Sequence, residues 1–213
     1  MSNSKLICKS FDYTNYNDRG DTKIKKITPH HMAGNLSLEE CAEVFRSRGS
    51  SANYIIDSNG NIGLFVPENK RAWTSSSREN DFQAVTIEVA NCGGEPDWKI
   101  SDKAFNACVA LCVDICQRNG IKSLNFTGDK NGNLTAHKMF AATACPGPYF
   151  YSKFPELAKK VNEKLKNGTS NKKTMYRVQI GGFNNYENAV KLAEQAKKAG
   201  FEVLIKAETN EVI

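Results

Sequence analysis

The stretch "AVTIEVAN", residues 84–91, is typical of a β-strand, because β-branched and apolar side chains fill it. Before the closing asparagine, its polar side chains are those of Thr86 and Glu88. A lone carboxylate in an apolar strand is costly to bury without a partner. Two interpretations of Glu88 therefore stay open: an edge position that faces solvent, or a general base with a raised pKa near a metal ion.

Further strands are predicted before this one. "KIKKITP", residues 23–29, predicts a short strand that runs into His30 and His31. "NYIIDSNGNIGLFV", residues 53–66, predicts a hairpin, since strand-forming residues flank a "DSNG" turn.

Helices are predicted between and after the strands. In the first of them Ser37 is a candidate N-cap, Glu40 completes a capping box, and Gly49 is a stop signal. The predicted helices cover residues 35–49, 101–120 and 154–168. Because strands alternate with helices, we expect an α/β fold with a mixed central sheet flanked by helices.

The chain is predicted to hold two domains. The first covers residues 1–166, and the polar stretch "NGTSNKK", residues 167–173, is a linker. Residues 174–213 predict a small β-α-β unit, with strands in "MYRVQIGGF" and "FEVLIKA" around an amphipathic helix. Such a unit is small for an independent core, so we expect it to pack on something or to belong to a larger module.

The composition excludes several classes of protein. The net charge of +6 favours polyanionic partners, but no Lys/Arg cluster or nucleic-acid motif occurs, so we expect no nucleic acid as partner. No apolar run approaches the ~20 residues of a membrane span, so we expect no membrane insertion. The N-terminal stretch has no apolar core of signal-peptide length, so no secretory signal is expected either.

The seven cysteines are an odd number, and without an export signal we expect them to be reduced thiols. Cys108, Cys112 and Cys116 lie four residues apart, which places them on one face of the helix predicted at 101–120. Small buried hydrophobic side chains explain this pattern better than a three-thiolate metal site.

Three histidines and a cysteine are candidates for a metal site. A catalytic zinc ion takes three protein ligands and keeps one open position, and His30, His31, His137 and Cys145 are of suitable type. The eight-residue step from His137 to Cys145 leaves enough chain for a loop to fold back, and a Pro-Gly pair turns the chain just after the cysteine. Spacing alone is a weak signal, because a lone His and Cys are more often structural.

Four blocks in a fixed order decide between these interpretations. They are "ITPHHMAGN", "SANYIIDSNGNI", "NDFQAVTIEVAN" and "LTAHKMFAATACPG". Together they closely resemble the zinc-dependent N-acetylmuramoyl-L-alanine amidases, which are related to the peptidoglycan recognition proteins. The resemblance covers residues 23–160 and is strongest to the endolysins of phages that infect Gram-positive bacteria.

The resemblance implies a role for each matched residue. His30, His137 and Cys145 match the zinc ligands of the family, whereas His31 matches the neighbour that does not bind zinc. Glu88 matches the catalytic glutamate of the endolysin branch.

Two positions depart from the pattern of the phage lysozyme-amidases. Ala52 stands where those relatives have a catalytic tyrosine, and Thr143 stands where they have a lysine. The peptidoglycan recognition proteins that have amidase activity resemble this chain at the position of Thr143. The implied role of Thr143 is therefore to donate a hydrogen bond to the developing oxyanion.

The C-terminal stretch "MYRVQIGGFNNYENAVKLAEQAKKAGFEVLIKA" resembles the first half of a SPOR domain. SPOR domains bind the glycan strands of peptidoglycan, so a cell-wall-binding module is implied. About half of such a domain is present, which leaves open whether the module is complete.

The expected function is hydrolysis of the amide between N-acetylmuramic acid and L-alanine, with a Zn²⁺ cofactor. Asn53, Trp73 and Asn91 are candidates for the lining of the substrate groove, and a buried core position is an equal alternative for Trp73. The main rival is a non-catalytic peptidoglycan-recognition module. A structural zinc domain would need a fourth ligand, from His31 or a spare cysteine.

The expected partner is bacterial peptidoglycan, from a Gram-positive wall in particular. An endolysin accumulates in the cytoplasm until lysis, when a holin-like protein opens the membrane, and we expect that localisation here. The oligomeric state and the host range are not predicted.

Overall fold

The computed structural model describes residues 2–169 and 179–207. The chain divides into two compact units, Met1–Asn171 and Lys172–Ile213. Helix α5, Phe154–Thr169, extends into the predicted linker, and the rest of that linker lies outside the described residues.

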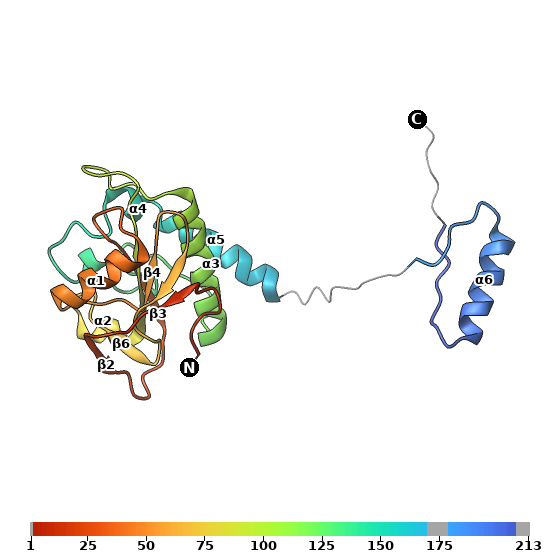
Figure 1. Cartoon of the computed structure of the whole chain (residues 1–213), viewed down its shortest axis with the longest axis horizontal. Coiled ribbons are helices and arrows are strands. Elements are labelled where there is room, and N and C mark those ends of the chain that lie inside the picture. The colour runs from red at the N-terminus through yellow and green to blue at the C-terminus, as the bar shows by residue number, and fades with distance from the viewer. Residues whose placement is uncertain (1, 170–178, 208–213) are drawn as a thin grey trace. The chain divides into compact units, whose positions relative to one another are not determined.

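A mixed sheet forms the centre of the first unit (Figure 1). It has five strands, in the order β1-β5-β4-β7-β3. Strands β3, β7 and β4 are parallel, β5 is antiparallel to β4, and β1 is parallel to β5. The predicted α/β fold is therefore confirmed. The strands are β1 Lys9–Ser10, β3 Lys26–His31, β4 Tyr54–Ile56, β5 Ile62–Leu64 and β7 Ala84–Val89.

Strand β7, the strand predicted at 84–91, lies inside the sheet. It pairs with β3 on one side and β4 on the other, so that Glu88 stands opposite His30 and Ile55. The interpretation of Glu88 as an edge residue is therefore wrong. Its side chain projects from one face of the sheet, and the Oε2 atom of the carboxylate is buried there, which matters for its acidity.

Helix α1, Leu38–Arg48, covers one face of the sheet, where it shares a buried apolar cluster with Ile55. It begins and ends as predicted from the sequence. The Ser37 hydroxyl accepts a hydrogen bond from the Glu40 N–H at 3.2 Å, and Glu40 accepts one from the Ser37 N–H at 2.8 Å. Gly49 ends the helix at a left-handed φ of 67°.

Helices α3, Asp102–Asn119, and α5 pack on the opposite face (Figure 1). The three cysteines of α3 are fully buried there, which confirms their interpretation as small apolar side chains; they are Cys108, Cys112 and Cys116. Of the described helices, none is both long and apolar enough to cross a bilayer.

Shorter elements surround the sheet. Strands β4 and β5 form the predicted hairpin, and strands β2 and β6 pair antiparallel in a second, two-stranded sheet. The remaining short elements are β2 Tyr16–Asp18, β6 Lys70–Ala72, α2 Arg78–Gln83, the 3₁₀ turn η1 His137–Met139 and α4 Pro148–Ser152.

A buried arginine ties β6 to α2. Arg19 is almost fully buried, and burial lowers its pKa to about 10 although Glu68 and Asp81 oppose the shift. Its guanidinium donates to backbone carbonyls instead of pairing closely with one carboxylate, which fixes the loops on this side of the sheet. The acceptors are the carbonyls of Glu68, Lys70, Asp81, Phe82 and Ala84.

The second unit holds helix α6, Tyr186–Lys198, which begins at the Asn185 cap as an amphipathic helix. Of the predicted β-α-β unit, the strand at 201–207 is not formed. The strand predicted in "MYRVQIGGF", residues 175–183, lies partly outside the described residues, and its described part, 179–183, forms no strand. A strand needs a hydrogen-bonded neighbour, and the described part of this unit supplies none. Several apolar side chains here stay exposed, among them Ile180, Phe201 and Leu204.

Candidate metal centre

Strands β3 and β7 bring a histidine and a carboxylate together. His30 and Glu88 are each the penultimate residue of their strand, and they are direct partners in the parallel register. Side chains that face each other in register lie on the same side of a sheet. Ligand sites in open α/β sheets form at the carboxyl ends of strands, where these two residues lie.

The loop after η1 returns to the same place. The backbone N–H of Lys138 donates to the carbonyl of Cys145 at 3.2 Å, so the two ends of the eight-residue step are joined. The segment before η1 runs beside β3, because the Ile27 N–H donates to Asn133 and the Thr135 N–H donates back to Ile27. The predicted folding back of this loop is confirmed.

The structure thus brings His30, His137 and Cys145 into one cluster. One donor atom from each residue lies within 4.8 Å of the others, and Cys145 Sγ is 3.3 Å from His30 Nδ1. The two imidazole rings are 5.0 Å apart. A closed structural zinc site would require a fourth protein ligand. In the described parts of the chain no fourth His, Cys, Asp or Glu side chain joins the group.

Burial sets the charge of these groups. It lowers the pKa of His30 well below the usual value, and the neighbouring His137 lowers it further. Burial also lowers the pKa of His137, although Asp81 acts in the opposite direction. Both imidazoles are therefore neutral at pH 7 and free to offer a lone pair.

The thiol of Cys145 is held in its protonated form by burial, which raises its pKa, and by the nearby Glu88. A divalent cation would favour the thiolate, because metal binding releases the thiol proton. Two neutral imidazoles and one thiol are a donor set that suits zinc. The residues present therefore fit such an ion.

Glu88 lies beside this cluster without a hydrogen-bond partner for its Oε2 atom, which is buried although part of the residue is accessible. Burial raises the pKa of its carboxyl to about 8. A carboxyl with such a pKa can take up and release a proton near neutral pH.

His31, the neighbour of His30, does not join the cluster. Successive side chains of a strand point to opposite faces, as expected. The His31 ring instead packs edge-on against Trp98, with the centroids 5.4 Å apart.

Gly147 lies directly behind this ring. Its φ is +82°, and a Cβ atom there would come within 2.9 Å of the Trp98 Cβ and 3.2 Å of His31 Nδ1. The Gly147 N–H donates to the Ala144 carbonyl at 2.7 Å and closes the turn that follows Cys145. A glycine is needed here for its backbone conformation and for the close approach of the neighbouring side chains.

We therefore expect Gly147→Ala to destabilise the metal-free protein more than a matched control. Gly128 has a similar φ of +80° but open space around it, so Gly128→Ala should cost about 1 kcal/mol for conformation alone. Overpacking against Trp98 should add ~1–3 kcal/mol in Gly147→Ala. Urea unfolding in a chelator measures the difference, and equal losses in both variants would refute the steric argument.

Thr143 lies in the same loop, two residues before Cys145. Its hydroxyl oxygen accepts a hydrogen bond from the Cys145 N–H at 3.2 Å, and the residue is partly exposed. The hydroxyl proton remains available to a ligand.

The two asparagines expected in the groove are buried instead. Asn53 Oδ1 accepts from the Thr86 N–H at 3.0 Å, and its Nδ2 donates to the Val66 carbonyl at 3.0 Å. Asn91 Nδ2 donates to the Trp98 carbonyl at 2.7 Å. Their amides satisfy backbone groups beside the site, so they stabilise its loops and present no surface to substrate.

Trp73, the third residue expected in the groove, is 40% exposed. Its indole Nε1–H donates to Asn17 Oδ1 at 2.8 Å, and its backbone N–H donates to Ser51 Oγ. The alternative of a buried core tryptophan is therefore wrong, and its contact with substrate stays a prediction.

Hydrogen bonds between polar side chains join the segments that carry the two histidines of the cluster. Thr28 and Thr135, each two residues before a cluster histidine, are 2.8 Å apart at their hydroxyls. The Asn80 side chain donates to Thr28 at 3.0 Å and accepts from Thr135 at 3.3 Å. These contacts link β3, α2 and the segment before η1.

Sequence reasoning missed Ser76. Its hydroxyl lies 3.2 Å from His137 Nε2, although the two residues are 61 positions apart. The serine-rich run before α2 signals a helix N-terminus, which Ser77 provides, but no local pattern could indicate a contact with a distant histidine.

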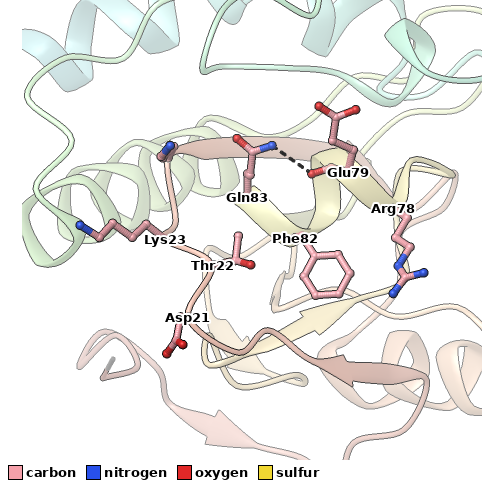
Figure 2. Close-up of a pocket in the computed structure, with 8 residues that line it drawn as sticks. Asp21, Thr22, Lys23, Arg78, Glu79, Phe82 and Gln83 are labelled. Carbon is pink, nitrogen blue, oxygen red and sulfur yellow. Dashed lines mark hydrogen bonds between the residues drawn. The ribbon is translucent and has the colours of Figure 1, made fainter.

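The pocket drawn in Figure 2 lies elsewhere. Side chains of both charge signs line it, and it includes none of the cluster residues. Its lining residues are Asp21, Thr22, Lys23, Lys25, Arg78, Glu79, Phe82 and Gln83.

Comparison with protein families gives two matches. The family model described as N-acetylmuramoyl-L-alanine amidase matches residues 20–148, more than half of the chain. The model described as SPOR domain matches residues 156–207, so that its match begins within α5. No curated protein sequence matches the chain.

Solved structures with a similar fold include the N-acetylmuramoyl-L-alanine amidase LysC from Clostridium intestinale URNW. It is 22% identical, with a TM-score of 0.57 over 75% of this chain and 98% of that one. The Staphylococcus aureus hydrolase AmiA is 16% identical, with a TM-score of 0.61 over 79% and 87%. The Ph2119 endolysin from the Thermus scotoductus MAT2119 bacteriophage Ph2119 is 19% identical, with a TM-score of 0.51 over 68% and 90%.

Proposed function

Because this chain belongs to the N-acetylmuramoyl-L-alanine amidase family, we propose that His30, His137 and Cys145 hold a zinc ion for hydrolysis of peptidoglycan. The bond cleaved is the amide between N-acetylmuramic acid and L-alanine. The observation that carries this proposal is the cluster of three donors beside the partnerless carboxylate of Glu88.

Three protein ligands leave one position of a tetrahedral zinc ion open to water or substrate. Zinc, when bound there, supplies a Lewis acid that acidifies water and polarises a carbonyl oxygen. The chain contributes the shape of the site and the movement of protons.

Glu88 is the proposed general base. It takes a proton from the attacking water as the water oxygen bonds to the carbonyl carbon, and it later delivers that proton to the alanine nitrogen as the C–N bond breaks. Among the described residues no cation pairs with its buried Oε2, so its carboxyl is not held in the ionised form by a salt bridge.

Thr143 is proposed to stabilise the oxyanion. Its hydroxyl oxygen already accepts from the Cys145 N–H, which orients the group and leaves its proton to donate. A neutral donor aimed at a developing oxyanion lowers the barrier without holding a charge in the ground state. Trp73 is proposed to contact the substrate through its exposed face.

The amidase family and the SPOR domain both indicate peptidoglycan as the partner. We further propose a phage endolysin that acts on a Gram-positive wall, stays in the cytoplasm until lysis and depends on a holin-like protein for release. The support is the resemblance of the four sequence blocks to that branch, together with solved endolysins among the structures of similar fold.

Digestion of purified Gram-positive cell walls tests the proposed reaction. We expect new alanine amino termini without new reducing sugar ends, and loss of the signal in a chelator with recovery on adding zinc. Reducing ends in place of amino termini would indicate a glycosidase and refute the proposal.

A further inference from the structure

We propose that Ser76 is a positioning residue that fixes the tautomer and orientation of His137, so that His137 presents Nδ1 to the metal. The inference rests on the proposed function, because it concerns a ligand of the same site. The contact that carries it is the 3.2 Å distance from the Ser76 hydroxyl to His137 Nε2.

An imidazole ligand has two nitrogens, and the partner of one decides which is left for the metal. If Ser76 Oγ accepts a hydrogen bond from Nε2–H, the neutral ring carries its lone pair on Nδ1. Hydrogen bonds of this kind from outside the ligand set orient metal-binding histidines and raise their basicity.

Hydrogen bonds on both sides of Ser76 fix the backbone of the loop that carries it. The Asp81 carboxylate accepts from the backbone N–H groups of Thr74 and Ser75 and from the Ser75 hydroxyl at 2.6 Å. Ser77 caps helix α2 directly after it. Ser76 is therefore flanked on both sides by residues whose positions are fixed.

Ser76 also adopts an unfavourable backbone conformation, with a φ of 60° that L-residues seldom take. Such a conformation persists where surrounding contacts hold it, and it occurs often at functional sites. Glycine would adopt this φ without strain, so a serine at this position carries a conformational cost that glycine would not.

This conformation supplies a sharp test. Ser76→Gly removes the hydroxyl and relieves the backbone, so the metal-free variant should be at least as resistant to urea as the wild type. Its zinc affinity, measured by competition with a chromophoric chelator, should fall about 10–100-fold, as is typical when such a supporting contact is lost. A merely structural role for Ser76 would not lower affinity while stability is kept.

Ala33→Gly is the matched control. Ala33 is exposed and also has a positive φ of 52°, so the change relieves the same kind of strain without removing a hydroxyl. Its zinc affinity should equal that of the wild type.

The tautomer is read directly by long-range ¹H–¹⁵N NMR of the zinc-loaded wild type, where His137 should carry its proton on Nε2. A metal-bound Nε2, or equal zinc affinities of Ser76→Gly and wild type, would overturn the role of Ser76 and leave the proposed function intact. A wild-type chain that binds no zinc would overturn both.

Discussion

Glu88→Gln is expected to lower kcat by about 100-fold or more while stabilising the metal-free protein. Glutamine keeps the shape of the side chain but cannot accept the proton of the attacking water, and general-base catalysis typically contributes 10²–10⁴-fold. Release of alanine amino termini from purified cell walls measures the loss. Wild-type turnover in this variant would remove Glu88 from the mechanism.

The stability effect follows from the raised pKa. Glu88 titrates near 8 in the folded metal-free chain against a reference of 4.5, because burial disfavours its charge. Below pH 4.5 both states are protonated and no penalty exists. Between 4.5 and 8 the unfolded state ionises first, so stability falls as the pH rises.

At pH 7 the penalty amounts to roughly 3 kcal/mol, from 2.5 pH units at about 1.36 kcal/mol each. Glutamine does not ionise, so the stability gain of Glu88→Gln should grow from pH 4.5 to 8 and then level off. Urea unfolding with a chelator at pH 5 and pH 7 measures it. The exposed Glu163 on α5 is the control, since Glu163→Gln should change neither stability nor activity.

Cys145→Ala is expected to lose bound zinc and hydrolytic activity together. The cysteine is the one ligand of the three that can carry a negative charge, and two neutral imidazoles alone hold a divalent ion weakly. Zinc affinity should fall on the order of 100-fold or more, since an outer-shell contact alone is worth 10–100-fold. Metal analysis of the dialysed protein and the cell-wall assay measure the two losses.

A second buried cysteine separates loss of a ligand from loss of packing. Cys116 is fully buried in α3, outside the cluster, so Cys116→Ala removes a thiol of the same size from the core. Cys116→Ala should lower the free energy of unfolding, but the variant should still bind one zinc ion per chain. If Cys145→Ala also retained one zinc ion per chain, Cys145 would not be a ligand.

Much of the fold follows from signals between residues that are near one another in the sequence. The Ser37 cap and the Gly49 stop of α1 are formed as predicted, because a cap depends on a side chain and backbone groups only a few positions apart. The run at 84–91 forms strand β7 for a similar reason, since its β-branched side chains favour an extended backbone. The strand predicted at 201–207 is not formed, because a strand also needs a hydrogen-bonded neighbour from another part of the sequence.

The candidate metal ligands could be named from the sequence because their order matches a family pattern, and the fold brings them within reach of one another. The surroundings of these ligands could not be predicted from the sequence. Whether Glu88 lay at an edge or inside the sheet depended on β3 and β4, which come from other parts of the chain.

The sequence by itself determined the type of fold, the helix ends and the residues able to bind a metal, because local backbone preferences and side-chain chemistry are written in short stretches. Only the tertiary structure decided that the amides of Asn53 and Asn91 bind backbone groups, that the Oε2 atom of Glu88 is buried without a hydrogen-bond partner, and that Ser76 contacts His137. Burial and the acidity that it changes arise from contacts between distant segments, and those exist only once the chain has folded.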